Sequence, residues 1–155
     1  MSSSAAPRPP VFSALSREEC LALLNRHAVG RIAYAFHDRV DIQPVHYVQS
    51  EGWLYGRTSE GSKLDTIAHN RWVAFEVDEV RGTFDWASAV VHGAFYRLDP
   101  EAPAQAEREH AARAAALLEN VVPNTLSLGD PVPFRTVLFR VHVDEVTGRR
   151  AVPGR

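Results

Sequence analysis

Most of the chain alternates apolar and polar positions with the two-residue period of β-strands. Three apolar, β-branched and aromatic runs follow one another closely, divided by turn-like segments: 29–36, 41–49 and 53–58. They predict an antiparallel meander. Two further strands are expected at 72–77 and 86–98, and a last one at 134–143. Pro44 cannot donate to a ladder, so we expect it at an edge, a bulge or beside a ligand.

Helical spacing of apolar residues occurs in three segments between these runs. Ser16 and Glu19 form an S-x-x-E capping box, which predicts that a helix of about three turns follows. Residues 59–70 carry a short apolar stripe with Ser59 or Ser62 as the expected N-cap, and residues 101–120 are rich in Ala. The segment 121–133 contains three prolines and should be a loop or arm. About six strands with outer helices predict a mainly β, α+β fold: a small barrel or curled sheet.

Composition places the chain among ordinary globular domains. It has 155 residues, 45% of them apolar and 23% charged, with a net charge of −2. We expect one domain over residues 13–150, with a loose tail at 1–12 and a short tail at 151–155. The chain has no surplus of basic residues of the kind that would indicate nucleic acid binding, and it has no apolar run long enough for a membrane helix. The sequence therefore predicts a cytoplasmic protein without nucleic acid or membrane partners.

Cysteine and histidine give little support for a metal site or a covalent mechanism. Cys20 is the single cysteine, and the seven histidines show no HxxxH or HxH spacing on one predicted element. No G-x-S-x-G motif of a serine hydrolase is present. We expect Cys20 to be buried and inert, and we assign no metal ligand and no catalytic residue.

The most informative chemistry lies between residues 55 and 64, where a strand turns into a helix. Arg57 and Lys63 supply positive charge there, and Thr58, Ser59 and Ser62 supply hydroxyl donors. A helix N-terminus favours an anion, so the segment suits a phosphate monoester. An ordinary capped helix with a solvated Arg and Lys explains the same residues about equally well.

The same residues carry a family resemblance. The step GSKLD at 61–65, the segments VAFEVDEV at 73–80 and WASAVVHG at 86–93, and VTGR at 146–149 occur in this order. Together they resemble the pyridoxamine 5'-phosphate oxidase-like flavoproteins, in particular the branch that includes nitroimidazole-resistance proteins. The resemblance runs from about Leu15 to Arg150.

The resemblance implies a six-stranded antiparallel split barrel and a homodimer that binds FMN at the subunit interface. Arg57, Thr58, Ser62 and Lys63 would hold the phosphate, and the strand Gln43, Pro44, Val45 and His46 would run along the isoalloxazine edge. Trp86 and Ser88 would approach from the partner subunit. The elements with which true pyridoxamine-phosphate oxidases bind their substrate have no counterpart, so that specific activity is not expected.

The function predicted in this way is that of an FMN-dependent oxidoreductase that passes hydride or electrons to a small-molecule acceptor. Two alternatives remain open at this point. The same fold could hold the deazaflavin F420 in a reductase, or the chain could be a flavin- or haem-binding carrier or sensor without enzymatic activity.

Overall fold

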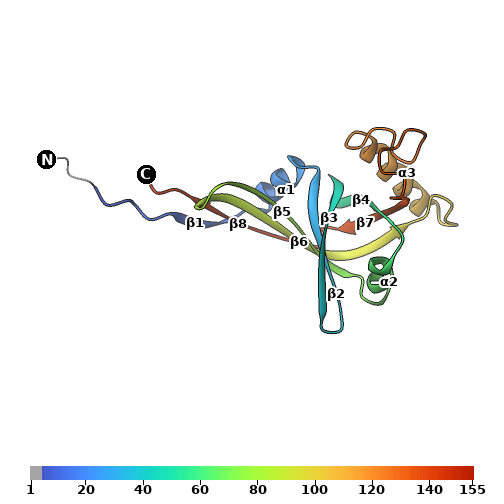
Figure 1. The fold of residues 1–155 in the computed structure, drawn as a ribbon, viewed down its shortest axis with the longest axis horizontal. Coiled ribbons are helices and arrows are strands. Elements are labelled where there is room, and N and C mark those ends of the chain that lie inside the picture. Colours follow the sequence, from blue (N-terminus) through green and yellow to red (C-terminus); the bar gives the residue numbers. More distant parts are fainter. Residues whose placement is uncertain (1–4) are drawn as a thin grey trace.

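A computed structural model describes residues 5–155 of the chain (Figure 1). The first four residues of the predicted tail lie outside the described residues. Eleven helices and strands occur in this order: β1 Val11–Leu15, α1 Arg17–Asn25, β2 Val29–Phe36, β3 Arg39–Ser50, β4 Trp53–Thr58, α2 Ser62–His69, β5 Trp72–Gly82, β6 Asp85–Leu98, α3 Gln105–Glu119, β7 Val137–His142 and β8 Glu145–Val152.

Six of the strands close into a barrel, which confirms the predicted fold class. The pairing order is β6–β5–β2–β3–β4–β7, and β7 returns to pair with β6. The long strand β6 makes the closure possible because its two halves have different partners. Residues Trp86 to His92 pair with β8, whereas Phe95 to Leu98 pair with β7. Gly93 lies at the change of partner, where a Cβ atom would come within 1.9 Å of the carbonyl oxygen of His142.

Two strands extend the sheet beyond the barrel and were not predicted. β8 is the antiparallel neighbour of β6. β1 in turn pairs with β8, and the register runs from Val11 opposite Val152 to Leu15 opposite Gly148. Ordered structure therefore reaches beyond the predicted limits of residues 13 and 150 at both ends, because each end supplies the hydrogen-bonding partner of the other. Together with the β5–β6 hairpin, these two strands form a long extension of the sheet, and α1 packs against one side of this extension (Figure 1).

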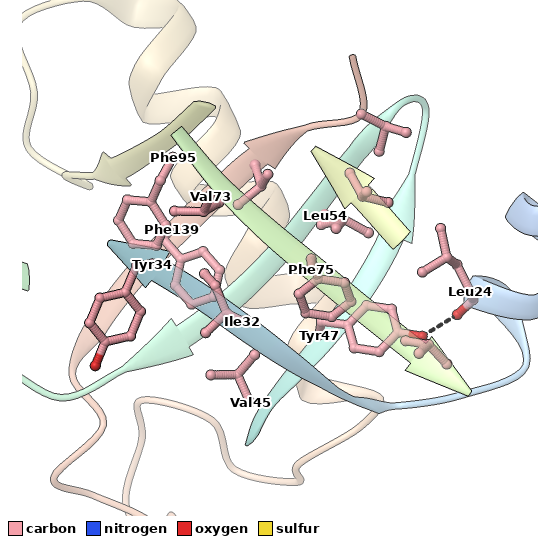
Figure 2. Packing of buried hydrophobic residues seen from close by; sticks show 14 of the residues in the cluster. Leu24, Ile32, Tyr34, Val45, Tyr47, Leu54, Val73, Phe75, Phe95 and Phe139 are labelled. Carbon is pink, nitrogen blue, oxygen red and sulfur yellow. Dashed lines mark hydrogen bonds between the residues drawn. The ribbon is translucent and has the colours of Figure 1, made fainter. Parts of the chain in front are cut away.

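The barrel interior holds the main hydrophobic core. Side chains from β2, β3, β5 and β7 meet there, among them the almost fully buried Ile32, Tyr47, Phe75 and Phe139 (Figure 2). The Tyr47 hydroxyl donates to the carbonyl of Leu24 and so ties α1 to the barrel. Burial in this environment raises the pKa of Tyr47.

Helix α1 begins as predicted. Ser16 is its N-cap and accepts a hydrogen bond from the amide of Glu19 at 3.1 Å, while the Glu19 carboxylate accepts from the amide of Ser16 at 3.1 Å. This is the reciprocal capping box. The thiol of Cys20 in the next turn is fully buried, and burial raises its pKa.

Helix α3 covers the outer face of β4 and β7 and forms a second, smaller core with them. Tyr55, Leu98, Ala114 and Leu118 are its main buried side chains. The segment after α3, residues 120–136, is called the arm loop here; it runs back along the barrel to β7. No helix within residues 5–155 is long and apolar enough to cross a membrane.

Candidate functional site

A cavity of about 280 Å³ lies where β4 ends and α2 begins. Seven of the ten residues predicted for the site line it: Gln43, Pro44, Val45, Arg57, Thr58, Ser62 and Lys63. Ser59, Glu60, Gly61, Phe134 and Arg135 complete the lining. We call this cavity the cradle.

Helix α2 starts later than predicted, and its N-cap is a glycine rather than Ser59 or Ser62. Gly61 adopts φ 153° and ψ −169°, a backbone conformation that is essentially restricted to glycine. Its carbonyl accepts from the amides of Leu64 and Asp65, at 3.1 Å and 3.4 Å. Because glycine has no side chain to cap the helix, the first amide groups of α2 are left available to an anion.

Arg57 is held rigidly behind the cradle. It follows Tyr55 by two residues on β4 and therefore lies on the outer face of the barrel, where the arm loop covers it completely. Its Nε donates to the carbonyl of Arg135 and its Nη2 to the carbonyl of Val132, both at 2.9 Å. Nη2 also lies 2.5 Å from the carboxylate of Asp130.

The arm loop also supplies backbone hydrogen-bond donors to the carboxylate of Asp130. Its carboxylate accepts from the amides of Leu126 and Val132, each at 2.9 Å. The hydrogen bond from Arg57 lowers the pKa of Asp130 to about 2, and the two amides add to this effect. The negative charge of Asp130 therefore offsets the charge of Arg57 at any pH near neutrality.

One buried nitrogen of Arg57 remains without a protein partner. Nη1 has no hydrogen-bond acceptor among residues 5–155, although it is shielded from solvent. A buried donor without an acceptor is costly, and a charged donor more so. An anionic oxygen in the cradle, which Arg57 lines, is the type of acceptor that this nitrogen lacks.

Lys63 and Arg135 supply the positive charge of the cradle that Asp130 does not offset. Burial lowers the pKa of Lys63, and the nearby charge of Arg135 lowers it further. Two cations held close together repel each other, so a bound anion between them would be stabilised by both. A phosphate monoester, which is nearly a dianion at neutral pH, matches this pair.

His46 lies beside the cradle through its contact with Arg135. Nη1 of Arg135 donates to Nδ1 of His46 at 3.2 Å, an arrangement that requires a neutral imidazole. Burial, followed by the charges of Arg135 and Arg57, lowers the pKa of His46. Pro44 lies on the part of β3 where the described strands pair only with β2, because β4 joins β3 from Tyr47 onward. The expectation of an edge position for Pro44 is therefore correct.

Trp86 and Ser88 do not reach the cradle of their own chain. Trp86 lines a different cavity beside α1 and packs against Phe12, with 6.3 Å between ring centroids. The Ser88 hydroxyl donates to the carboxylate of Glu76 at 3.0 Å. Strands β5 and β2 separate β6 from β3, so both residues could approach a cradle only from a second copy of the chain.

Sequence reasoning missed the contribution of the arm loop, namely Asp130, Phe134 and Arg135. Phe134 and Arg135 were placed at the start of a strand, which actually begins at Val137. The available signal was indirect: an arginine near the end of a strand requires a carboxylate partner if it becomes buried, and Asp130 lies in the proline-rich loop.

The fold and this cavity define a split barrel with an anion-binding cradle at the junction of a strand and a helix. A family model described as pyridoxamine 5'-phosphate oxidase matches residues 16–150, and the chain belongs to this family. This confirms the resemblance drawn from the sequence motifs.

Three relatives cover nearly the whole chain. An uncharacterised protein of Rhizobium meliloti (strain 1021) is 32% identical over 148 residues, which cover 90% of this chain and 95% of that protein. The crystal structure of a FAD-binding protein from Mesorhizobium loti is similar with a TM-score of 0.73 and 26% identity, covering 93% of this chain and 99% of that one. A FAD-binding protein from Mycobacterium smegmatis has a TM-score of 0.64 and 26% identity, covering 90% and 99%.

Proposed function

We propose that this chain is a flavoprotein that binds FMN, with the phosphate in the cradle, and acts as an oxidoreductase on a small-molecule acceptor. The observation that carries the proposal is the buried Nη1 of Arg57, which lacks an acceptor within residues 5–155, on a residue that lines the same cavity as Lys63 and Arg135. The FAD-binding proteins similar to this chain support the choice of a flavin.

The strand β3 would support the flavin ring. Gln43, Pro44 and Val45 line the same cavity as the phosphate-binding residues, along the part of β3 that β4 leaves free. Backbone groups at such an edge can hydrogen-bond a planar ring without a specialised side chain. The Gln43 amide donates to the Tyr34 hydroxyl at 3.1 Å, so its position is fixed by the protein.

The flavin would supply the hydride and electron chemistry, while the chain binds and orients it. No described side chain in the cradle combines the position and the proton affinity of a general acid or base. His46 is neutral and occupied by Arg135, and Lys63 faces the anion. The role of these residues in the proposal is therefore binding, not proton transfer.

The test compares FMN with riboflavin, which lacks the phosphate. FMN should bind the parent protein, and Lys63→Ala or Arg135→Ala should each raise its Kd about ten- to a hundredfold, because a charge-assisted contact is worth about 1.5–3 kcal/mol. The weaker binding of riboflavin should hardly change. Arg113→Ala, which removes a half-exposed arginine on α3 outside the cradle, is the matched control.

The visible spectrum of the purified protein and a turnover assay complete the test. Oxidation of NADH or NADPH with a dye acceptor would support the oxidoreductase, whereas a flavin without turnover would indicate a carrier or sensor. Deazaflavin or haem in place of flavin would contradict the FMN proposal. So would equal effects of the cradle variants on FMN and riboflavin.

We also propose that the protein is a homodimer that forms across the open face of the sheet. This face, opposite α1, carries well-exposed apolar side chains on several strands: Phe12, Ile42, Trp72 and Val80 are each half exposed or more. Apolar residues gathered on one face indicate an interaction surface, and two-fold dimers are the commonest assembly. Trp86 pairs with Val80, and Ser88 lies two residues further along the same strand, so both side chains are on the face of Val80, from which a second copy could bring them to the cradle.

Sedimentation should give twice the mass of the chain at micromolar concentration. Ile42→Glu should shift the protein toward monomer and weaken FMN binding, whereas Ile42→Val should do neither. A stable monomer of the parent protein that binds FMN fully would contradict this part of the proposal.

A further inference from the structure

A second cavity, of about 620 Å³, lies between α2, the end of β6 and the start of α3. We call it the side cavity. Glu60 is the single described residue that lines both this cavity and the cradle, so the residues proposed to hold the flavin leave the side cavity free. Its volume falls within the range of small-ligand sites. The fold therefore contains a place for a ligand other than the flavin.

The floor of the side cavity is apolar. Leu64 and Ile67 come from α2, and Phe95 and Leu98 from the end of β6. All four side chains belong to the hydrophobic cores and are therefore held in place. An apolar group can pack on this floor without a rearrangement of the protein, so the floor suits a ligand with an apolar body.

Each carboxylate that lines the side cavity has a stabilising partner within the protein. Glu60 forms a salt bridge with Arg97, which lines the same cavity. Asp65 lies in the first turn of α2 and Glu107 in the first turn of α3, where the dipole of a helix stabilises negative charge. The negative charges of the cavity are thus compensated without a ligand.

The other two arginines of the side cavity, Arg71 and Arg140, have no carboxylate partner. Neither forms a salt bridge with an acidic side chain among residues 5–155. Arg71 is exposed, so water solvates its charge, whereas Arg140 is half-buried. A charge that is partly withdrawn from water needs a counter-charge or hydrogen bonds. Arg140 is therefore the cation of this cavity that a ligand can serve.

Two aromatic rings flank the guanidinium of Arg140 without satisfying its donors. The guanidinium lies 4.1 Å from the ring centroid of Trp53 and 5.2 Å from that of Tyr96. Aromatic rings stabilise a positive charge, but they do not replace an oxygen acceptor for an N–H group. The Nε of Arg140 is buried and has no such acceptor among the described residues. What Arg140 lacks is an acceptor for its N–H groups, not a partner for its faces.

We propose that the side cavity binds a small organic monocarboxylate, whose carboxylate group pairs with Arg140 and whose apolar body packs on the floor. A carboxylate supplies both the acceptor that Nε lacks and a counter-charge, and its two oxygens match the planar guanidinium. An uncharged ligand would leave the charge of Arg140 uncompensated. A dianion such as a phosphate monoester would be repelled by the three carboxylates that line the same cavity: Glu60, Asp65 and Glu107.

The test uses 2-naphthoate as the probe and 2-naphthamide, which has nearly the same shape but no charge, as its matched control. Isothermal titration of the full chain should give a Kd for 2-naphthoate below about 1 mM. The amide should bind at least about tenfold more weakly, because charge-assisted hydrogen bonds are about twice as strong as neutral ones. Equal affinities of acid and amide would overturn the proposal, and so would a failure of 2-naphthoate to bind at millimolar concentration.

Ala106→Trp tests the location of the probe. Ala106 lines the side cavity from α3 and is exposed, so a tryptophan there should fill the cavity and leave the fold intact. The Kd of 2-naphthoate should rise at least about tenfold. The matched control Ala112→Trp, at an exposed position of the same helix outside the cavity lining, should leave this Kd unchanged. Unaltered binding in Ala106→Trp would place the probe elsewhere and overturn the proposal.

Arg140→Gln tests the partner of the carboxylate. It should reduce the affinity for 2-naphthoate to that for 2-naphthamide, whereas Arg113→Gln, a half-exposed arginine of α3 outside the cavity, should not. Lys63→Ala separates this site from the cradle, because 2-naphthoate should bind that variant as tightly as it binds the parent. Loss of the probe in Lys63→Ala but not in Arg140→Gln would place it in the cradle and overturn this proposal, while the proposed flavin site would stand. A failure of the protein to bind FMN would refute the proposed function alone.

Discussion

Arg57 and Asp130 form an ion pair that is closed to solvent: Nη2 and Oδ2 are 2.5 Å apart, and the side chains are 0% and 3% exposed. The pair joins β4 to the arm loop and fixes the arginine behind the cradle. The proposed phosphate would therefore compete with Asp130 for the charge of Arg57.

Asp130→Asn tests this competition. The variant keeps one acceptor oxygen, which can serve the amide of Leu126 or that of Val132 but not both, and it leaves the Arg57 charge uncompensated in a buried position. We expect the Tm of the apoprotein to fall and FMN to raise the Tm by more than in the parent, because the phosphate then supplies the missing charge. Thermal unfolding with and without FMN measures both effects, and a smaller FMN shift in the variant would show that Asp130 acts only by positioning Arg57.

Gly61→Ala tests the backbone at the start of α2. At φ 153° an alanine is strained by about 1–3 kcal/mol, although a Cβ there would have no neighbour within 4 Å among the described residues. We expect a lower Tm together with weaker FMN binding, because relief of the strain turns the first amides of α2 away from the cradle. Gly82→Ala, where the nearest atom is 3.9 Å away and φ is not positive, is the control that should change neither quantity.

The titration of His46 should report on the ligand in the cradle. Its pKa lies below the usual value because burial and the charges of Arg135 and Arg57 disfavour the imidazolium. A phosphate offsets these charges, so FMN should raise the pKa of His46 and, near pH 6, binding should take up a proton. NMR pH titrations with and without FMN measure the change. A pKa of His46 that stays fixed or falls on FMN binding would place the phosphate elsewhere.

The contacts of Glu79 with Arg26 and His27 at the end of α1 should contribute stability that is lost in acid. The hydrogen bond from Arg26, followed by that from His27, lowers the pKa of Glu79 to about 2. A lowered folded-state pKa adds stability above the unfolded value of 4.5, and this stability is lost as the pH falls from 4.5 to about 2. Glu79→Gln should therefore cost about 1 kcal/mol at pH 7, since Arg26 is half exposed, and almost nothing at pH 2. Urea unfolding at the two pH values measures the free energy of unfolding, with Glu101→Gln as an exposed control. An equal loss of stability at both pH values would show that the charge of Glu79 is not the cause.

The meander at the start of the barrel could be predicted because its pattern is local. β2 and β4 have the predicted limits. The buried residues of β2 alternate as a two-residue period requires, whereas β4 is buried on both faces because α3 and the arm loop cover its outer side. β1 and β8 could not be found in the same way. Only Gly148 and Ala151 are buried in β8, so its sequence has no apolar alternation, and its partners β1 and β6 come from distant parts of the chain.

The cradle shows the same division. Arg57, Thr58, Ser62 and Lys63 belong to one continuous strand–turn–helix segment, whose chemistry is legible in the sequence. Arg135 reaches them only because α3 packs on β4 and β7 and directs the arm loop back over Arg57. No local pattern encodes that path, so the second cation of the cradle became visible only in three dimensions.

The pairing of β1 with β8 also has a consequence for the order in which the protein folds. Residues 11–15 leave the ribosome early, yet their only described strand partner is β8, near the other end of the chain. Contacts of such long sequence separation form slowly, because a large loop must be closed before they contribute. Strands β2 to β6 can begin to pair as they emerge, but Phe12 and its neighbours remain an unpaired apolar segment until residues 145–152 have been made. Truncation within β8 should therefore cause aggregation of newly made chains before it causes any loss in the cradle itself.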